Sequence, residues 1–433
     1  MAEAGATQSG NYFVSNYPPF SFWTPEATGE VERVLQSTPD PEVPLGLYVH
    51  IPFCRKRCDF CYFKVYTDKG AHEIQRYLEA VVAELEAWLP HPYLDGRKPR
   101  FVYFGGGTPS YLSRAQLDYF FGALRERLPW DEAQEIAFEC EPGTLVGDKL
   151  FAIRDAGITR LSLGVENFDA EILEHNNRAH RTDEIHRAWN QAREADFAQL
   201  NLDLIAGMVG ETDPNWQHCI SETVRLEPES VTIYQMEVPF NTTLSQRMRA
   251  DGTPAPVADW PTKRRWVSEA FAALEERGYH LSSAYTACKD ESVRFLYRDA
   301  LWRGADMLGI GVSSFSHLGG VHFQNETSIE PYMQGVAQSG RVLARAMRPT
   351  EEERMIREFV LQMKLGRLEA GYFQQRFGVD VLQRFAGPLR RHASEGWLEL
   401  EESAVVATRP GLLRMDELLH DYFLDEHRGV RFV

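Results

Sequence analysis

Hydrophobic residues along the chain alternate between two patterns. Short apolar runs bounded by Gly and Pro are typical of buried strands, and stretches of helical periodicity separate them. Six strands are expected, near residues 46–51, 100–104, 135–139, 160–164, 199–205 and 230–234. Between the first two, residues 71–88 place Ile74, Leu78, Val81 and Leu85 on one helical face. This alternation predicts an α/β fold, a (β/α)6 partial barrel whose working end is the C-terminal edge of its strands.

The pattern changes before and after these six units. We expect four parts, namely a tail with an aromatic arm, the barrel, an extension that covers the substrate, and a mostly helical domain, at residues 1–44, 45–240, 241–347 and 348–433. In the extension, the apolar pattern predicts a helix near 261–277 and a strand near 279–284, and residues 308–320 are rich in glycine. Strands near 397–400 and 405–408 predict a hairpin that makes the last part winged-helix-like.

Composition narrows the class of protein. The 433 residues are 43% hydrophobic and 25% charged, which is typical of globular proteins and excludes disordered, collagen-like and small disulfide-stapled classes. The net charge of −17 repels phosphate backbones and anionic lipid, so neither a nucleic acid nor a membrane is expected as a partner. Residues 1–10 lack the order of a signal peptide, and no apolar run is long enough to span a bilayer. We expect a cytoplasmic protein.

Three of the six cysteines, Cys54, Cys58 and Cys61, lie in the segment H-I-P-F-C-R-K-R-C-D-F-C-Y-F directly after the first predicted strand. Three thiolates at this C-x3-C-x2-C spacing can hold three irons of a [4Fe–4S] cluster and leave the fourth iron open. The alternatives are zinc, which needs a fourth ligand such as His50 at an unusual spacing, or inert thiols. The isolated Cys140, Cys219 and Cys288 are expected to be buried apolar residues.

This cysteine motif, with an aromatic residue before its last Cys, resembles that of the radical S-adenosylmethionine (SAM) superfamily. Further segments are similar to the oxygen-independent coproporphyrinogen III oxidase group, namely F-G-G-G-T-P-S-Y-L at 104–112, R-L-S-L-G-V-E-N-F at 160–168, N-N-R-A-H at 176–180 and N-L-D-L-I-A-G at 201–207. That group also includes heme chaperones, heme-opening enzymes and class C radical SAM methyltransferases and cyclopropanases. The resemblance covers the chain from about residue 16 to its end.

The resemblance implies which residues bind SAM. Matching positions are Tyr48, Gly106, Gly107, Thr108, Glu139, Glu166, Arg178, Asp203, Met236 and Phe315. Adjacent glycines let backbone amides approach a bound carboxylate or amine, although a glycine triplet alone is more often a turn. Carboxylates at the ends of buried strands are costly without partners, so Glu139, Glu166 and Asp203 either form structural ion pairs or hold polar groups of SAM. His180, His317 and His322 are weaker candidates for substrate contacts.

The resemblance also implies the chemistry. One electron, from a donor of flavodoxin or ferredoxin type, would pass through the cluster to cleave SAM to a 5′-deoxyadenosyl radical. The cofactors are then a [4Fe–4S] cluster and SAM, with two SAM molecules expected. The substrate is a small molecule, a porphyrinogen or a natural-product precursor.

Three reactions remain open. Overall similarity favours oxidative decarboxylation of porphyrinogen propionates. Two departures favour methyl or methylene transfer from a second SAM to an sp2 carbon. Glu166 stands where the oxidases have Gln, and Phe63 stands where they have a further Cys. The third possibility is heme binding and delivery.

Overall fold

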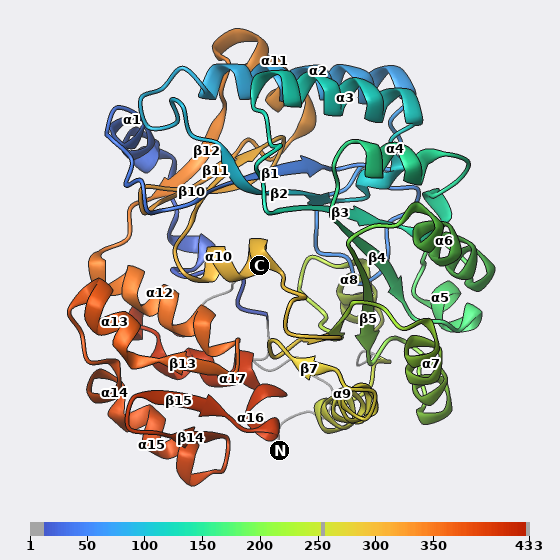
Figure 1. Cartoon of the computed structure of the whole chain (residues 1–433), viewed down its shortest axis with the longest axis vertical. Coiled ribbons are helices and arrows are strands. Elements are labelled where there is room, and N and C mark those ends of the chain that lie inside the picture. The colour runs from blue at the N-terminus through green and yellow to red at the C-terminus, as the bar shows by residue number, and fades with distance from the viewer. Residues whose placement is uncertain (1–12, 253–255, 430–433) are drawn as a thin grey trace.

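The computed structural model describes residues 13–252 and 256–429, and its centre is a run of parallel strands in sequence order (Figure 1). The strands are β1 (Leu45–Ile51), β2 (Pro99–Gly106), β3 (Glu135–Cys140), β4 (Arg160–Glu166), β5 (Gln199–Ala206) and β6 (Ser230–Gln235). Each pairs in parallel with the next along the chain. Their apolar residues are buried on both faces of the sheet, as parallel strands require. The predicted (β/α)6 partial barrel is confirmed.

Helices of the crossover connections cover the outer face of this sheet. They are α2 (Ala71–Trp88), α3 (Arg114–Arg127), α4 (Lys149–Asp155), α5 (Ala170–His175), α6 (Thr182–Ala195) and α7 (Asp213–Leu226). In α2 the predicted stripe of Ile74, Leu78, Val81 and Leu85 is buried against the strands. Because these helices occupy one face, the inner face and the C-terminal strand ends remain available for a site (Figure 1).

The extension adds six strands to the barrel sheet, whose full order is β12-β11-β10-β9-β1-β2-β3-β4-β5-β6-β8-β7. They are β7 (His280–Leu281), β8 (Thr286–Cys288), β9 (Asp306–Ile310), β10 (Phe315–Leu318), β11 (Val321–Asn325) and β12 (Leu343–Met347). The single strand expected near 279–284 is instead the β7–β8 pair. The glycine-rich stretch is strand and turn, because Gly319 and Gly320 have positive φ angles that suit the tight β10–β11 turn.

In the described residues before the C-terminal part, further α-helices are α1 (Gly29–Leu35), α8 (Thr243–Asp251), α9 (Trp260–Glu275), α10 (Leu296–Trp302) and α11 (Ile329–Ser339). The helix predicted near 261–277 is α9, which begins after Asp259, whose carboxylate accepts from the Thr262 amide. Among the described residues, no helix combines the length and apolarity needed to cross a bilayer.

The C-terminal part is mostly helical, as predicted, and has its own hydrophobic core around Phe359. Its elements are α12 (Glu351–Met363), β13 (Arg367–Glu369), α13 (Ala370–Phe377), α14 (Val381–Arg384), α15 (Ala386–Ser394), β14 (Leu398–Leu400), β15 (Ala404–Ala407), α16 (Arg409–Leu412) and α17 (Met415–Leu419). The predicted hairpin is β14–β15, and β13 adds a third strand that the sequence pattern did not indicate. This part lies below the barrel sheet in Figure 1.

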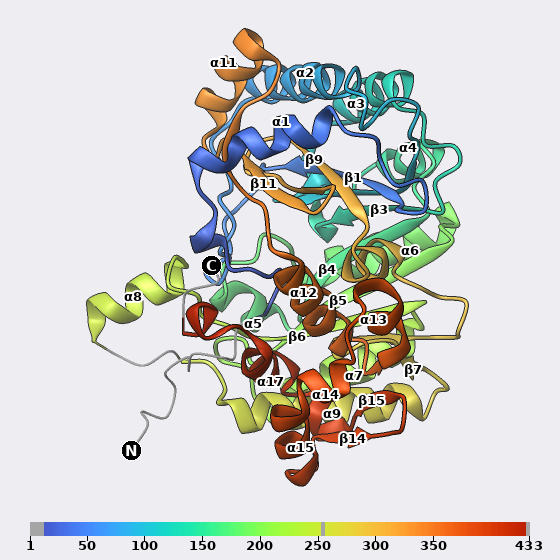
Figure 2. The same ribbon diagram turned by 90° about the vertical axis from the view of Figure 1, so that its left-hand side faces the viewer.

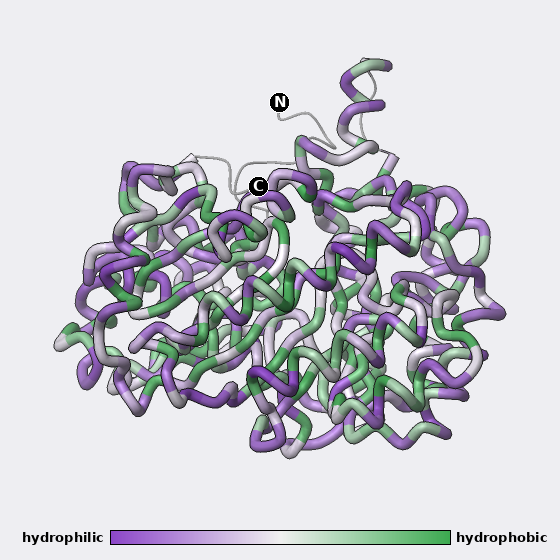
Figure 3. The backbone as a smooth tube through the Cα atoms, turned by 90° about the horizontal axis from the view of Figure 1, so that it is seen from above, coloured by the Kyte–Doolittle hydropathy of each residue, from purple (hydrophilic) through white to green (hydrophobic). Residues whose placement is uncertain are grey.

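The aromatic arm joins the barrel to the C-terminal part. The Phe13 amide donates to Glu237 beyond β6, and the Val14 amide donates to Asp416 on α17. Lys364, which is fully buried, donates to the Val14 carbonyl and pairs with Asp416 at 2.9 Å. The arm and the C-terminal part therefore close the inner side of the barrel. Viewed from above, hydrophilic and hydrophobic positions alternate along the chain, as expected for amphipathic elements (Figure 3).

Candidate active site

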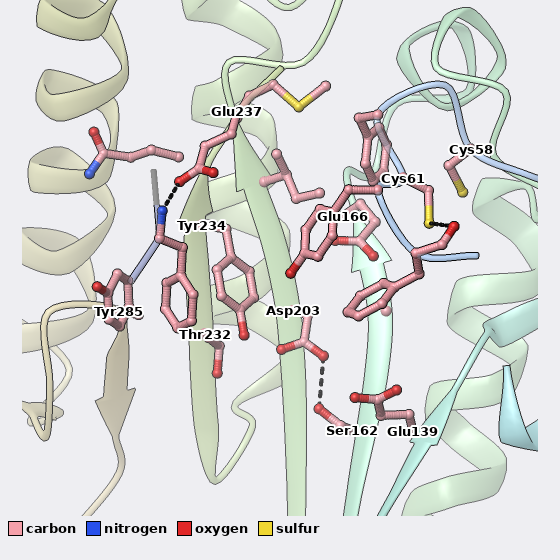
Figure 4. Close-up of a pocket in the computed structure, with 18 of the residues that line it drawn as sticks. Cys58, Cys61, Glu139, Ser162, Glu166, Asp203, Thr232, Tyr234, Glu237 and Tyr285 are labelled. Carbon is pink, nitrogen blue, oxygen red and sulfur yellow. Dashed lines mark hydrogen bonds between the residues drawn. The ribbon is translucent and has the colours of Figure 1, made fainter. Parts of the chain in front are cut away.

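A cavity of about 420 Å³ lies inside the barrel at the C-terminal ends of its strands. It is bounded by the loops after β1, β2 and β3, by residues on β4, β5 and β6, and by the C-terminal part. Eleven of the predicted site residues line it, namely Cys54, Cys58, Cys61, Gly106, Gly107, Thr108, Glu139, Glu166, Arg178, Asp203 and Met236. The sequence therefore located one shared site from residues that lie far apart along the chain (Figure 4).

Two predicted SAM contacts do not line this cavity. The Tyr48 hydroxyl is hydrogen-bonded to His50 Nδ1 at 3.0 Å. Phe315 packs against the aromatic arm, with ring centroids 4.5 Å from Phe20 and 5.6 Å from Trp23. Both are partly buried, and neither is part of the cavity wall.

The three histidines considered as substrate contacts pack against other parts of the protein instead of lining the cavity. His180 is 2% exposed and lies between Glu141 and the Val165 carbonyl. His317 and His322 stack on each other with centroids 4.6 Å apart, and neither lines the cavity. Burial lowers the pKa of His317 to about 3, so it stays neutral at physiological pH. None of the three histidines lines the cavity, so a substrate contact by any of them stays a prediction.

The cysteine loop connects β1 to α2 and is pinned at its start and middle. The Cys54 amide donates to the Tyr66 carbonyl at 3.1 Å, and the Asp59 amide donates to the Asn176 carbonyl at 3.2 Å. Thr108 Oγ1 donates to Cys54 Sγ at 3.3 Å, and Arg178 Nη1 donates to Cys58 Sγ at 3.2 Å. Cys58 and Cys61 lie together at one side of the cavity in Figure 4.

The donor set, three thiols at one cavity, is of the kind that a [4Fe–4S] cluster with one open iron needs. All three sulfurs line one cavity, and two already accept hydrogen bonds of the kind that stabilise thiolate ligands. Burial raises the pKa of Cys54 to about 12 and that of Cys61 to about 11. These thiols would therefore ionise only together with a bound metal.

Cys140, Cys219 and Cys288 are each at most 4% exposed, as expected for buried apolar residues. Cys140 on β3 also reaches the cavity wall. Cys140 is the last residue of β3, whereas the cysteine loop follows β1.

The glycine segment at the end of β2 packs directly on the start of the cysteine loop. Gly106 has a φ of 114°, and a Cβ atom there would lie 2.5 Å from the His50 ring. The amides of Gly107 and Thr108 donate to the carbonyls of Ile51 and Phe53 at 2.7 and 2.8 Å. Because these amides bind the protein itself, they are not directed at a ligand, contrary to the sequence-based interpretation. Glycine is required here for close backbone approach.

Three largely buried carboxylates face the cavity from neighbouring strands. Glu139 accepts from the Tyr103 hydroxyl and the Gly106 amide, and Asp203 accepts from Ser162 and Asn201 at 2.8 and 2.9 Å. Burial raises the pKa of Glu139 and of Glu166 to about 7, and it also raises that of Asp203. A cationic ligand between them would stabilise their ionised forms, so the cavity favours positive charge.

Arg178 links the cysteine loop to β4. Its Nη2 donates to the Gly164 carbonyl at 2.6 Å and lies 3.4 Å from Glu166 Oε1. Glu166 has a left-handed φ of 64° at a bulge where the pairing of β4 with β5 shifts. Both terminal nitrogens of Arg178 are therefore occupied, one by Cys58 and one by β4. Through these contacts Arg178 ties the cysteine loop to the end of β4.

One part of the site was missed by sequence reasoning. Arg55, next to the first cysteine, binds Glu141 through two hydrogen bonds of 2.9 Å. Burial alone would raise the pKa of Glu141, but His180 and Arg55 hold it at about 2. This pair, in which Glu141 is buried and Arg55 is partly exposed, ties the cysteine loop to the end of β3. The segment F-E-C-E-P at 138–142 contains two acidic residues, Glu139 and Glu141. The sequence analysis considered only Glu139 as a site residue.

Comparisons with known proteins agree with this geometry. The model of the radical SAM superfamily matches residues 48–222, and that of the HemN C-terminal domain matches residues 350–414. The oxygen-independent coproporphyrinogen III oxidase of Escherichia coli is 28% identical over 391 residues, covering 86% of this chain and 84% of that protein. The heme chaperone HemW of Bacillus subtilis is 27% identical and covers 86% of this chain and 97% of its own.

A solved structure shows the same architecture over nearly the whole chain. It is that of coproporphyrinogen III oxidase (HemN) from Escherichia coli, a radical SAM enzyme. It superimposes with a TM-score of 0.80 at 26% identity and covers 95% of this chain and 96% of its own.

The contact of Gly106 with His50 gives a test of the site. Gly106→Ala should lower SAM affinity about tenfold, because a left-handed residue and a displaced His50 ring disturb the loop that holds Cys54. Equilibrium dialysis of reconstituted protein measures this affinity. The matched control is Gly122→Ala in α3, where a Cβ meets nothing within 4 Å. Unchanged SAM binding by Gly106→Ala would contradict this account of the loop.

Proposed function

From the radical SAM and HemN C-terminal domains that the chain carries, we propose that it is a radical SAM enzyme of the coproporphyrinogen oxidase-like family. The observation that carries this proposal is the meeting of three cysteines and the glycine segment at one wall of a cavity. Bound there, a [4Fe–4S] cluster would supply the electron that cleaves SAM to methionine and a 5′-deoxyadenosyl radical.

The chain's own residues would hold the cluster and its SAM and exclude water. Cys54, Cys58 and Cys61 are the proposed cluster ligands. The amides of Gly107 and Thr108 donate to carbonyls of β1 and the cysteine loop. We therefore propose that the Thr108 hydroxyl and backbone carbonyls accept hydrogen bonds from the ammonium of SAM. Glu139 supports this role, because its carboxylate is buried beside Gly106 and would balance a cation. The closed inner side of the barrel would protect a radical from solvent.

For the substrate reaction, the first candidate is oxidative decarboxylation of coproporphyrinogen III in porphyrin and heme biosynthesis. The relatives of this name, which match along most of the chain, support it. A propionate would lose a hydrogen atom to the deoxyadenosyl radical, then carbon dioxide and one electron to an acceptor, and would become a vinyl group.

The second candidate is methyl or methylene transfer from a second SAM to an sp2 carbon. Glu166 favours it, because this additional acid faces the cavity from β4 while Asp203 faces it from β5. Two acids on neighbouring strands of the cavity suit a second sulfonium. Heme delivery is the third candidate, supported by the HemW relatives.

Anaerobic turnover distinguishes these reactions. With coproporphyrinogen III, SAM and dithionite, the first candidate predicts products lighter by carbon dioxide and two hydrogens for each propionate that reacts. Methyl transfer instead predicts label from the SAM methyl group in the product, together with S-adenosylhomocysteine. Intact SAM cleavage without any change in coproporphyrinogen would eliminate the first candidate. Heme binding without SAM turnover would favour the third.

The second SAM has a separate test. Asp203→Ala should lower the binding stoichiometry from two SAM per chain to one and leave the iron content unchanged, because Asp203 lies on β5 and makes no contact with the cysteines. Equilibrium dialysis of reconstituted protein measures this. The control is Glu211→Gln, a buried carboxylate outside the cavity that binds the Gly207 amide. A wild-type plateau at one SAM would contradict the proposal.

A further inference from the structure

Three aromatic rings of the cavity wall have a large uncovered surface. Tyr62, Phe63 and Tyr234 line the cavity and are 38%, 42% and 41% exposed. Aromatic rings of this size are usually covered by other apolar groups in a folded protein. None of the three is among the residues proposed above to hold the cluster or SAM. Their uncovered faces are therefore available to a further ligand in the same cavity.

The open surface of two of these rings faces the interior of the protein. Burial is the largest cause that raises the pKa of Tyr62 and of Tyr234, because protein atoms surround both phenols. Neither hydroxyl has a hydrogen-bond partner within the part of the chain that the structure describes. Figure 4 shows the Tyr234 ring pointing into the pocket from β6. A ring that protein surrounds and that is still exposed borders an internal cavity.

Tyr62 and Phe63 form the wall on the cysteine loop. Their rings lie against each other with centroids 4.5 Å apart and an interplanar angle of 32°. The Tyr62 carbonyl accepts from the Asn241 side chain at 2.9 Å, just before α8, the helix that stands out from the body of the molecule in Figure 2. This hydrogen bond fixes the backbone directly after Cys61. Because Phe63 stands where the oxidases have a further Cys, an aromatic ring replaces a thiol in this wall.

Tyr234 forms the opposite wall, at the end of β6. The loop after β1 and the end of β6 belong to the first and last strands of the parallel run, and both line the cavity. In Figure 4, Tyr234 and Cys61 lie on different sides of the pocket. Tyr285 stacks on Tyr234 at a centroid distance of 6.3 Å, and Phe13 meets Tyr234 edge-on at 6.4 Å. These two rings hold Tyr234 in place, so the cavity has aromatic walls on two sides.

Carboxyl groups lie beside both walls. Besides burial, Glu237 and Glu139 raise the pKa of Tyr62. Asp203 and Glu139 act in the same way on Tyr234. Burial raises the pKa of Glu237 itself to about 8, so this carboxyl is largely protonated at neutral pH and can donate a hydrogen bond. Such groups suit ring nitrogens and carbonyl oxygens, whereas a ring that carries several carboxylates would meet like charge here.

We infer that Tyr62, Phe63 and Tyr234 form an aromatic clamp that binds the substrate by stacking on a planar, conjugated ring. This inference rests on the proposed function and narrows it, because a planar ring supplies the sp2 carbon of the second candidate reaction. Stacking on aromatic side chains favours flat rings. Coproporphyrinogen III, whose pyrroles are joined by sp3 carbons, is not flat. The clamp begins directly after Cys61, so it holds the ring beside the proposed cluster.

The experiment compares a flat ligand with a puckered one. 2-Naphthol and decahydro-2-naphthol share a carbon skeleton and one hydroxyl, but only the first is planar. Reconstituted protein with SAM and without reductant should bind 2-naphthol about tenfold more tightly or better, as equilibrium dialysis measures. The long-wavelength absorption band of bound 2-naphthol should shift to the red and weaken, which is the spectroscopic signature of a stacked ring.

Substitutions then assign the stacking to the clamp. Tyr62→Leu and Tyr234→Leu should each lower the affinity for 2-naphthol about tenfold and remove the absorption shift, because the aromatic face is lost. Tyr62→Phe and Tyr234→Phe keep the ring and should keep both. The matched control is Tyr119→Leu, since Tyr119 on α3 is 39% exposed but lies outside the cavity. It should bind 2-naphthol as the wild type does.

Three outcomes would overturn the inference. They are equal binding of the two naphthols by the wild type, a loss of affinity in the Phe variants as large as in the Leu variants, and an equal loss in Tyr119→Leu. If a Leu variant loses its iron, the Phe variants and the wild-type spectrum still decide, because an absent shift contradicts stacking. Failure of the wild type to cleave SAM with dithionite would instead contradict the proposed function, since the naphthol comparison uses no reductant.

Discussion

The close backbone contact between the end of β2 and the start of the cysteine loop is the constraint on which the site depends. Gly107 and Thr108 donate their amides to Ile51 and Phe53, so the turn after β2 extends the β1–β2 pairing into the loop. A Cβ at Gly107 would lie 2.9 Å from the Phe53 carbonyl oxygen. With this contact in place, Thr108 reaches Cys54 Sγ, and Cys54 lies at the cavity wall rather than in solvent. Glycine is needed here because it lets the turn pack closely on the loop and so positions the loop.

Burial of charge at the strand ends is the second determinant. Glu139, Glu166 and Asp203 are held on parallel strands around one cavity, and burial shifts each toward its protonated form. Arg178 lies next to Glu166 only, because its terminal nitrogens are held by Cys58 and the Gly164 carbonyl. A cavity of this kind is best occupied by a cationic molecule, which fits the sulfonium and ammonium of SAM. The same burial makes the site sensitive to loss of any one acid.

The sequence predicted the barrel and the polar residues at its strand ends that meet in the cavity, because both depend on local signals. Apolar runs identify buried strands, and residues just after such strands must meet at one edge. Contacts made across the fold have no such signal. The side-by-side placement of β9 and β1 and the occupation of Arg178 by Cys58 and Gly164 depend on residues far away in the chain. The packing of Phe315 on Phe20 of the arm is another such contact, because the two residues are about 300 positions apart in the sequence.

The central claim is that three cysteines of one loop hold a cluster with an open iron. Iron and sulfide analysis of anaerobically reconstituted protein tests it most directly. The account predicts about four irons and four sulfides per chain. Single Ala substitutions of Cys54, Cys58 or Cys61 should abolish the cluster, whereas those of Cys140, Cys219 or Cys288 should retain it. Stoichiometric zinc without iron in the native protein, or an intact cluster after loss of one loop cysteine, would contradict it.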